Sequence, residues 1–202
     1  MKISFFDIGS YHGKEIDLFI NEITGLYPYS VNAFEAHPEY AKKLSLKYKK
    51  DPNVNIHSIA IGDCMNETGF TKLFLAPNEE GNSIYSSKNN VTQDYVNVPI
   101  EKFSKIIKKL NINLDDSYNI VRFNIEGAEL DLIQDLILNN LHKKINLFLG
   151  AKAGEDILKV KEISHKYKGY MELLKREDIT IHPYCYVYGR KNISIKSTIN
   201  SQ

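Results

Sequence analysis

The stretch Phe5-Phe6-Asp7-Ile8-Gly9-Ser10-Tyr11-His12-Gly13 decides the fold, because an apolar run ends there at an acidic residue and two glycines. Directly after it, apolar residues recur at helical spacing from Ile16 to Ile23. The pattern predicts a buried strand, a glycine turn and a helix, which is the opening unit of a doubly wound α/β fold.

The same unit recurs along the chain. Residues 31–34 form the next apolar run, and Pro38 occupies the first position of a helix predicted over residues 39–49. Further elements of this kind are predicted as strands at 54–61, 119–125 and 145–149 and as helices at 103–110, 130–136 and 155–167. The carboxyl ends of parallel strands share one edge of the sheet, and ligands of open α/β sheets bind at that edge.

Three segments depart from this rhythm. Between residues 64 and 100, strands predicted at 70–76 and 95–100 flank a loop rich in Asn, Gly and Ser, which indicates an inserted β-hairpin or flap. Residues 170–174 and 184–188 are predicted as an antiparallel pair, and the polar residues 194–202 are predicted to fray. We therefore expect one domain over residues 1–202, a Rossmann-like α/β fold with a mostly parallel sheet, helices on both faces and antiparallel C-terminal strands.

Composition bounds the partners. The 202 residues include 26 basic and 25 acidic side chains, so a formal net charge of +1 gives no general attraction to nucleic acid or an anionic membrane. Cys64 and Cys185 form no C-x-x-C pair, and no apolar run approaches the length of a membrane span. We expect a cytoplasmic protein with no metal site, no nucleic-acid partner and no membrane partner.

Two carboxylates indicate the ligand. Asp7 lies two residues before Gly9 and can face the ammonium of an amino-acid-bearing cofactor, while Glu35, 28 residues later at a strand end, can accept hydrogen bonds from ribose hydroxyls. The pair favours S-adenosylmethionine. A nicotinamide dinucleotide is disfavoured because Tyr11 and Lys14 stand where the G-x-G-x-x-G fingerprint needs glycines.

Four regions together resemble the FkbM-like family of S-adenosylmethionine-dependent O-methyltransferases. They are residues 6–13 (FDIGSYHG), 33–39 (AFEAHPE), 59–63 (IAIGD) with 81–84 (GNSI), and 121–129 (VRFNIEGAE). The resemblance runs from residue 3 to residue 136, about two thirds of the chain. It implies a class I methyltransferase fold and methyl transfer to a hydroxyl of a sugar, glycan or glycosylated small molecule.

The resemblance also implies roles for individual residues. Glu126 would be the base or a clamp for the acceptor, and Asn124 would orient it. His12 could serve as a base or bind a hydroxyl, although a lone histidine is more often structural. The predicted cofactor-binding residues are Asp7, Gly9, Ser10, Gly13, Glu35, Ala36, Ser58, Ile59 and Ala60, and the predicted substrate-binding residues are Ser83 and Glu129.

Three positions depart from the family pattern, with Arg122 in place of lysine, Asn124 in place of aspartate and Ala36 in place of proline. An amide cannot take up a proton as a carboxylate can. The chain is therefore either an enzyme that depends on Glu126 or a catalytically weakened nucleoside-binding module. Glu126 and Glu129 would also complement a helix dipole without any chemistry.

The first residues lead directly into a strand, so we expect no N-terminal helical cap over the active edge. The acceptor cleft would then be open, or a second subunit of a homodimer would complete it.

Overall fold

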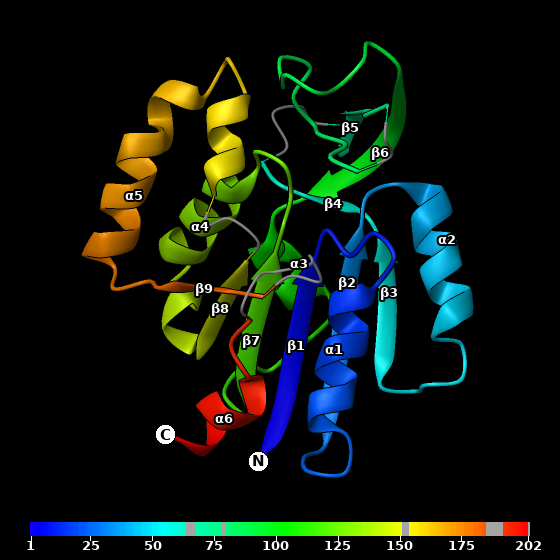
Figure 1. Ribbon diagram of the computed structural model, residues 1–202, viewed down its shortest axis with the longest axis vertical. Helices are drawn as coiled ribbons and strands as arrows, with labels where there is room; N and C mark the ends of the chain where they lie inside the picture. The colour runs from blue at the N-terminus through cyan, green and yellow to red at the C-terminus, as the bar shows by residue number, and fades with distance from the viewer. Residues whose placement is uncertain (64–67, 78–79, 151–153, 185–191, 202) are drawn as a thin grey trace.

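A six-stranded sheet organises the protein, and all its neighbouring strands are parallel (Figure 1). The computed structural model describes residues 1–63, 68–77, 80–150, 154–184 and 192–201. In spatial order the strands are β3 (Val54–Ser58), β2 (Tyr29–Glu35), β1 (Lys2–Ile8), β7 (Ser117–Phe123), β8 (Leu147–Gly150) and β9 (Ile181–Pro183). Counted within the sheet this is the doubly wound order 3-2-1-4-5-6, which confirms the predicted α/β fold with its parallel sheet.

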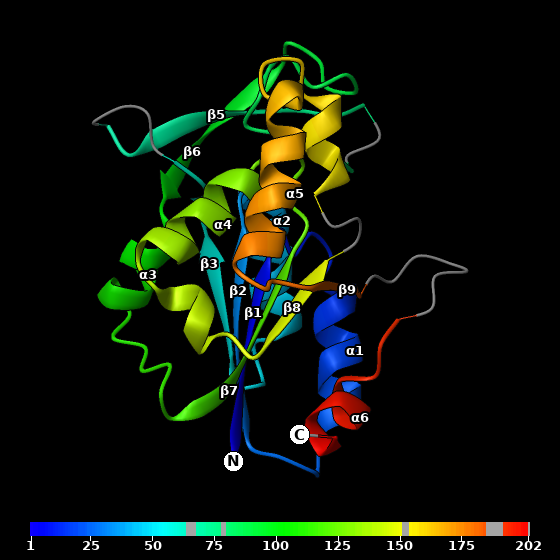
Figure 2. The same cartoon turned by 90° about the vertical axis from the view of Figure 1, so that its left-hand side faces the viewer.

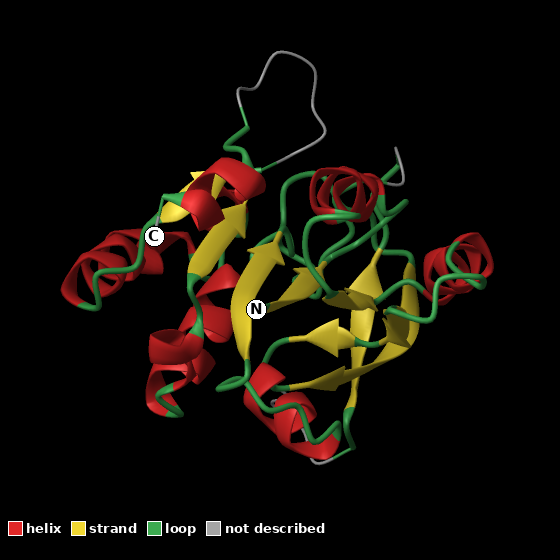
Figure 3. Cartoon of the chain, turned by 90° about the horizontal axis from the view of Figure 1, so that it is seen from below, coloured by secondary structure: helices red, strands yellow, loops and turns green. Residues whose placement is uncertain are grey.

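Helices cover both faces of the sheet, as Figures 2 and 3 show. One face carries α1 (Lys14–Ile23), α2 (Pro38–Lys47) and α6 (Ile195–Asn200), and the other carries α3 (Phe103–Lys109), α4 (Glu129–Leu138) and α5 (Tyr167–Arg176). Successive residues of β1 serve the two faces, because Phe5 stacks on Phe19 while Phe6 meets Phe103 edge-on. Among the helices that the structure describes, none is long and apolar enough to cross a bilayer.

A smaller sheet lies above the carboxyl ends of the main strands (Figure 1). It contains β4 (Ala60–Ile61), β6 (Tyr95–Glu101) and β5 (Phe70–Phe74), with β5 antiparallel to β6. The strand predicted over 54–61 is interrupted at Ile59, where the chain leaves β2 and joins β6 instead. The predicted inserted hairpin is therefore confirmed in the described part of residues 64–100.

The C-terminal strands differ from the prediction. Residues 170–174 belong to α5, because Tyr170 and Leu174 are four apart and both turn into the core, which is helical spacing. The sheet ends instead at β9, which runs parallel to β8, so the predicted antiparallel pair is wrong. Residues 155–167 form short 3-10 turns, η2 (Glu155–Lys159) and η3 (Ser164–Lys166), rather than one α-helix, and η1 (Leu141–Lys144) precedes β8. Residues 185–188, Cys64 and Cys185 lie outside the described residues.

The segment predicted to fray instead forms α6. Its two isoleucines, Ile195 and Ile199, lie four apart and are buried in the cluster beneath α1. The Ser194 hydroxyl caps the helix by accepting a hydrogen bond from the Ser197 N–H at 3.2 Å. The polar composition of this segment therefore concealed one apolar helix face.

Removal of the Ile195 side chain tests this packing. We expect Ile195→Ala to lower the free energy of unfolding by about 2–4 kcal/mol, because a fully buried aliphatic group is replaced by a cavity. Urea denaturation measures this change. The matched control Lys196→Ala, one residue further along on the exposed side, should stay within about 0.5 kcal/mol of wild type. Equal stabilities of Ile195→Ala and wild type would contradict the assigned packing.

Candidate functional site

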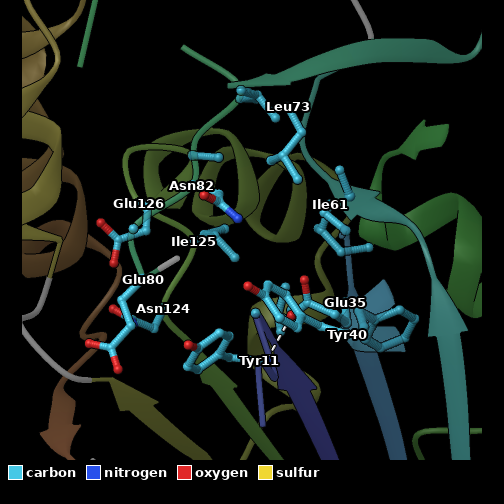
Figure 4. Close-up of a pocket in the computed structure, with 18 of the residues that line it drawn as sticks. Tyr11, Glu35, Tyr40, Ile61, Leu73, Glu80, Asn82, Asn124, Ile125 and Glu126 are labelled. Carbon is cyan, nitrogen blue, oxygen red and sulfur yellow. Dashed lines mark hydrogen bonds between the residues drawn. The ribbon is translucent and has the colours of Figure 1, made fainter. Parts of the chain in front are cut away.

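A cavity of about 410 Å³ opens at the carboxyl edge of the sheet, between the main strands and the small sheet. Its lining includes Gly9 after β1, Glu35 at the end of β2 and Asn124 after β7 (Figure 4). The chain order reverses between β1 and β7, and this is the switch point at which open α/β sheets bind ligands. The volume falls within the range of about 300–1,000 Å³ that is usual for small-molecule sites.

Glu35 presents a fixed carboxylate to the cavity. Its Oε2 accepts a hydrogen bond from the Tyr11 N–H at 2.7 Å, and its Oε1 accepts one from the His37 N–H at 2.8 Å. Burial raises the pKa of the Glu35 carboxyl, and the two backbone N–H groups partly offset the rise. Each carboxylate oxygen has a second lone pair, so Glu35 can also accept hydrogen bonds from a ligand hydroxyl.

An apolar wall adjoins Glu35. Ile59, Ala60 and Ile61 line the cavity where the chain passes from β3 to β4, and Leu73 of β5 closes it from above (Figure 4). Ala36 also lines the cavity. A flat apolar group can therefore lie beside the carboxylate. Ser58, the last residue of β3, is exposed and does not line the cavity, although it was predicted to contact the cofactor.

Asp7 is the main correction to the predicted site. Its side chain is fully buried and does not line the cavity. Along β1, Asp7 is on the same side as Phe5 and therefore turns under α1 instead of toward the open edge. Burial raises the pKa of Asp7, and the positive charge of Arg122 partly offsets the rise. The predicted direct contact of Asp7 with a ligand ammonium is therefore wrong.

Arg122 takes the place at the cavity that Asp7 was expected to hold. It lies beside Asp7 in the register of β7 against β1, and its Nη1 donates to Asp7 Oδ1 at 3.1 Å and to the Gly9 carbonyl at 2.9 Å. Its Nη2 lies 3.3 Å from Oε1 of Glu15, in the first turn of α1. Arg122 and Glu15 both line the cavity. Neither was predicted as a site residue, because the register of distant strands is not visible in the sequence.

The glycine turn serves mainly to bring chain segments together. Gly9 lines the cavity with φ +83°, and a Cβ there would overlap the Asn124 carbonyl, so the exits of β1 and β7 could not approach. At Gly13, φ is +71° and a Cβ would lie 2.7 Å from the Tyr48 hydroxyl. The Ser10 hydroxyl donates to the Asp7 carbonyl. Gly13 and Ser10 therefore shape the turn without lining the cavity.

Three aromatic rings form a second wall of the cavity. His12 lies against Tyr11 with ring centroids 3.8 Å apart, and Tyr40 stands edge-on to Tyr11 at 4.9 Å. All three line the cavity, with Tyr11 and Tyr40 facing the same space in Figure 4. His12 is thus placed beside the cavity as predicted, within an aromatic cluster.

Glu126 lines the opposite side and is held by a buried lysine. Lys88 Nζ lies 2.7 Å from Glu126 Oε2 and also donates to the Gly81 carbonyl at 2.8 Å and to Asn90 Oδ1 at 2.6 Å. These three contacts use all three protons of the ammonium group. The sequence gives no local signal for Lys88, because its partner comes from another part of the chain.

Backbone contacts also fix Glu126. Its φ of +55° is a left-handed conformation that costs a non-glycine residue on the order of 1 kcal/mol. The Ser83 hydroxyl donates to the Glu126 carbonyl at 2.8 Å, which ties the inserted loop to the turn between β7 and α4. Ser83 therefore supports the cavity without lining it, contrary to its predicted contact with substrate.

Glu129 closes the same turn from below. Its carboxylate accepts hydrogen bonds from the N–H groups of Ile125 at 3.1 Å and Gly127 at 2.8 Å, and it does not line the cavity. Burial raises the pKa of Glu129 to about 7. The predicted substrate contact of Glu129 is therefore replaced by a structural role.

The inserted loop adds two polar residues that were not predicted as site residues, Glu80 and Asn82. Figure 4 shows Glu80, Asn124 and Glu126 on one side of the cavity and Glu35 with Tyr40 on the other. Within the described ranges, no group of three or more His, Cys, Asp or Glu side chains is arranged to hold a metal ion.

The raised pKa of Glu129 predicts a pH dependence of stability. The folded protein holds this proton up to about pH 7, whereas the unfolded chain loses it near its ordinary value of 4.5. The folded state therefore binds more protons in this window, and the contribution of Glu129 to the free energy of unfolding falls by about 2 kcal/mol between about pH 5 and about pH 7.

Glu129→Gln should remove this part of the pH dependence. Urea denaturation at both pH values measures it, and Glu155→Gln on the exposed side of η2 is a control that should keep the wild-type slope. An unchanged slope in Glu129→Gln would contradict the assignment.

Comparisons with known proteins add a distant likeness. No protein-family model matches the sequence, and no curated protein matches it. The fold is similar to the crystal structure of methyltransferase FkbM from Methylobacillus flagellatus, with 13% sequence identity and a TM-score of 0.46. The match covers 85% of this chain and 36% of that one, so the chain spans just over a third of the length of that protein. A likeness of this extent assigns neither a family nor an activity to the chain.

Proposed function

We propose that this protein is an S-adenosylmethionine-dependent methyltransferase that methylates a hydroxyl of a sugar, a glycan or a glycosylated small molecule. The proposal rests on one observation: the cavity at the switch point of the sheet is lined by charged, hydrogen-bonding and apolar residues in separate regions. The cavity offers charged groups at Arg122 and Glu15, a hydrogen-bond acceptor at Glu35 and an apolar wall at Ile59 and Ile61.

These regions fit the three parts of S-adenosylmethionine. The apolar wall suits an adenine ring, Glu35 suits the two hydroxyls of a ribose, and the charged groups suit a zwitterionic amino acid. A dinucleotide fits poorly, because the turn after β1 carries Tyr11 instead of glycine and Gly9 is closed against the Asn124 carbonyl. The residues present therefore fit the nucleoside amino acid better than a pyrophosphate.

When bound, the cofactor supplies an activated methyl group. The protein has to hold an acceptor oxygen in line with that group and to accept its proton. Glu126 is the residue we assign to this task, because it lines the cavity and its Oε2 is fixed by Lys88, so that its other oxygen has a defined direction. Asn124 on the same side can orient a hydroxyl through its amide.

The walls around Glu126 favour a hydroxyl-rich acceptor. Asn82, Glu80 and Asn124 provide several hydrogen-bonding groups, and the ring of Tyr11 offers a flat face against which the C–H surface of a sugar can pack. This combination of polar groups with an aromatic face supports a carbohydrate as the acceptor.

A second candidate function is a nucleoside-binding module without turnover. It is favoured by one observation: the Glu126 carboxylate is already ion-paired with a buried lysine, and its neighbour Asn124 is an amide and not a carboxylate. In such a module the cofactor end of the cavity would function while the acceptor end would not.

Loss of the Glu35 carboxylate tests cofactor binding. We expect Glu35→Ala to raise the dissociation constant of S-adenosylhomocysteine roughly tenfold or more, because hydrogen bonds to a charged group are lost. Titration calorimetry measures the constant. Glu39→Ala, on the exposed face of α2, is the matched control and should leave it within about twofold of wild type. An unchanged constant in Glu35→Ala, with both variants folded by circular dichroism, would count against the proposal.

A pair of variants decides between the enzyme and the module. We expect wild-type protein to release S-adenosylhomocysteine when it is incubated with S-adenosylmethionine and a panel of sugars and glycans. Glu126→Gln should lower that rate by about 10²-fold or more while the dissociation constant of S-adenosylhomocysteine stays unchanged, because a proton acceptor is lost but the cofactor contacts remain.

Asn124→Asp is the complementary variant. An inactive wild type together with turnover in Asn124→Asp would identify an enzyme that has lost its activity, since the restored carboxylate can accept a proton. Absence of turnover in both, with cofactor still bound, would favour the module.

A further inference from the structure

The charged end of the cavity lacks the carboxylate that was expected there, since Asp7 is sealed beneath α1. A different carboxylate is present in its place. Glu15 lines the cavity from the first turn of α1, and its Oε1 lies 3.3 Å from Nη2 of Arg122. Asp7 and Glu15 therefore share one guanidinium, Asp7 from below and Glu15 from the cavity side.

We propose that Glu15 is the carboxylate that binds the ammonium group of the cofactor's amino acid, and that Arg122 positions it. The inference rests on the proposed function, since it assigns a residue to one end of the same ligand. Asp7 then acts indirectly, because it holds Arg122 and does not touch the ligand.

The local charges favour a cation at this point. Glu15 shares the Arg122 guanidinium with Asp7, so Arg122 is not a partner of Glu15 alone. The side chains are 0%, 11% and 3% exposed, respectively, and charges in such surroundings are weakly screened. The Gly9 carbonyl, which accepts a hydrogen bond from Arg122, adds a further negative dipole at the cavity wall. An ammonium group beside Glu15 would give its carboxylate a second cationic partner.

The neighbouring residue provides the opposite charge. Lys14 begins α1 and lines the cavity next to Glu15. An ammonium and a carboxylate at adjacent positions are complementary to the carboxylate and the ammonium of a zwitterionic amino acid. Glu35 faces the cavity from the next strand, so the amino acid and the ribose have separate carboxylates.

Two ligands that differ in the amino acid alone test the assignment. S-Adenosylhomocysteine carries the amino acid, whereas 5′-methylthioadenosine has the same nucleoside without it. We expect Glu15→Gln to raise the dissociation constant of S-adenosylhomocysteine roughly tenfold or more, because a charge-assisted hydrogen bond is lost. The dissociation constant of 5′-methylthioadenosine should stay within about twofold of wild type. Titration calorimetry on the full chain measures both constants.

Glu39→Gln is the matched control. Glu39 lies on the exposed face of α2 and does not line the cavity, so both constants should stay within about twofold. Glu15→Asp keeps the charge on a shorter side chain, and it should raise the dissociation constant of S-adenosylhomocysteine less than Glu15→Gln does. Circular dichroism establishes that each variant is folded.

The outcomes separate the two proposals. If wild type binds S-adenosylhomocysteine and Glu15→Gln leaves its constant unchanged, or weakens both ligands equally, the role of Glu15 is overturned while the proposed function stands. If wild type binds neither ligand, the proposed function fails as well. Selective loss of binding of the ligand that carries the amino acid, in Glu15→Gln but not in Glu39→Gln, supports the assignment.

Discussion

The buried pair of Arg122 and Asp7 is the interaction on which the rest of the site depends. It joins β7 to β1 at the point where the sheet reverses its order, and the same guanidinium holds the Gly9 carbonyl and reaches Glu15. Burial of such a pair is costly in itself, and loss of one partner leaves an uncompensated charge that costs about 3–5 kcal/mol. The pair is therefore better understood as a fixed geometry than as a source of stability, since it holds Arg122 in place at the cavity.

Structural features that depend only on a short stretch of sequence could be predicted. Phe5 and Phe6 are both buried because a parallel strand is covered on two faces, so a continuous apolar run was a sufficient signal for β1. Glu35 follows a similar run, and a side chain at a strand end has to lie near the open edge. The apolar positions Ile59 and Ala60 follow from the same reasoning, and both line the cavity beside Glu35.

The features that were missed depend on contacts between distant segments. Asp7 and Glu15 differ in their access to the cavity because of the side of β1 to which Asp7 points and the position of Arg122 on the strand alongside. One sequence carries no record of that register. Lys88 has no distinguishing feature in the sequence, because its role depends on its ion pair with the distant Glu126. Residues 170–174 were predicted as a strand, but Tyr170 and Leu174 are buried together on one face at helical spacing, and the segment forms a helix.

The two ends of the cavity are built from different parts of the molecule, and this division bears on specificity. The end with Glu35 and Arg122 stands on central strands whose backbone bonds and packing fix each position. The end with Glu126 depends on the inserted loop, which Lys88 and Ser83 attach to the turn after β7. Substitutions in that loop can reshape this side of the cavity while the central strands keep their positions, because the described backbone of the loop pairs with β5 and with residues 159–161, outside the six-stranded sheet. The side of the cavity next to the inserted loop is therefore the part of the site that can change most independently of the central sheet.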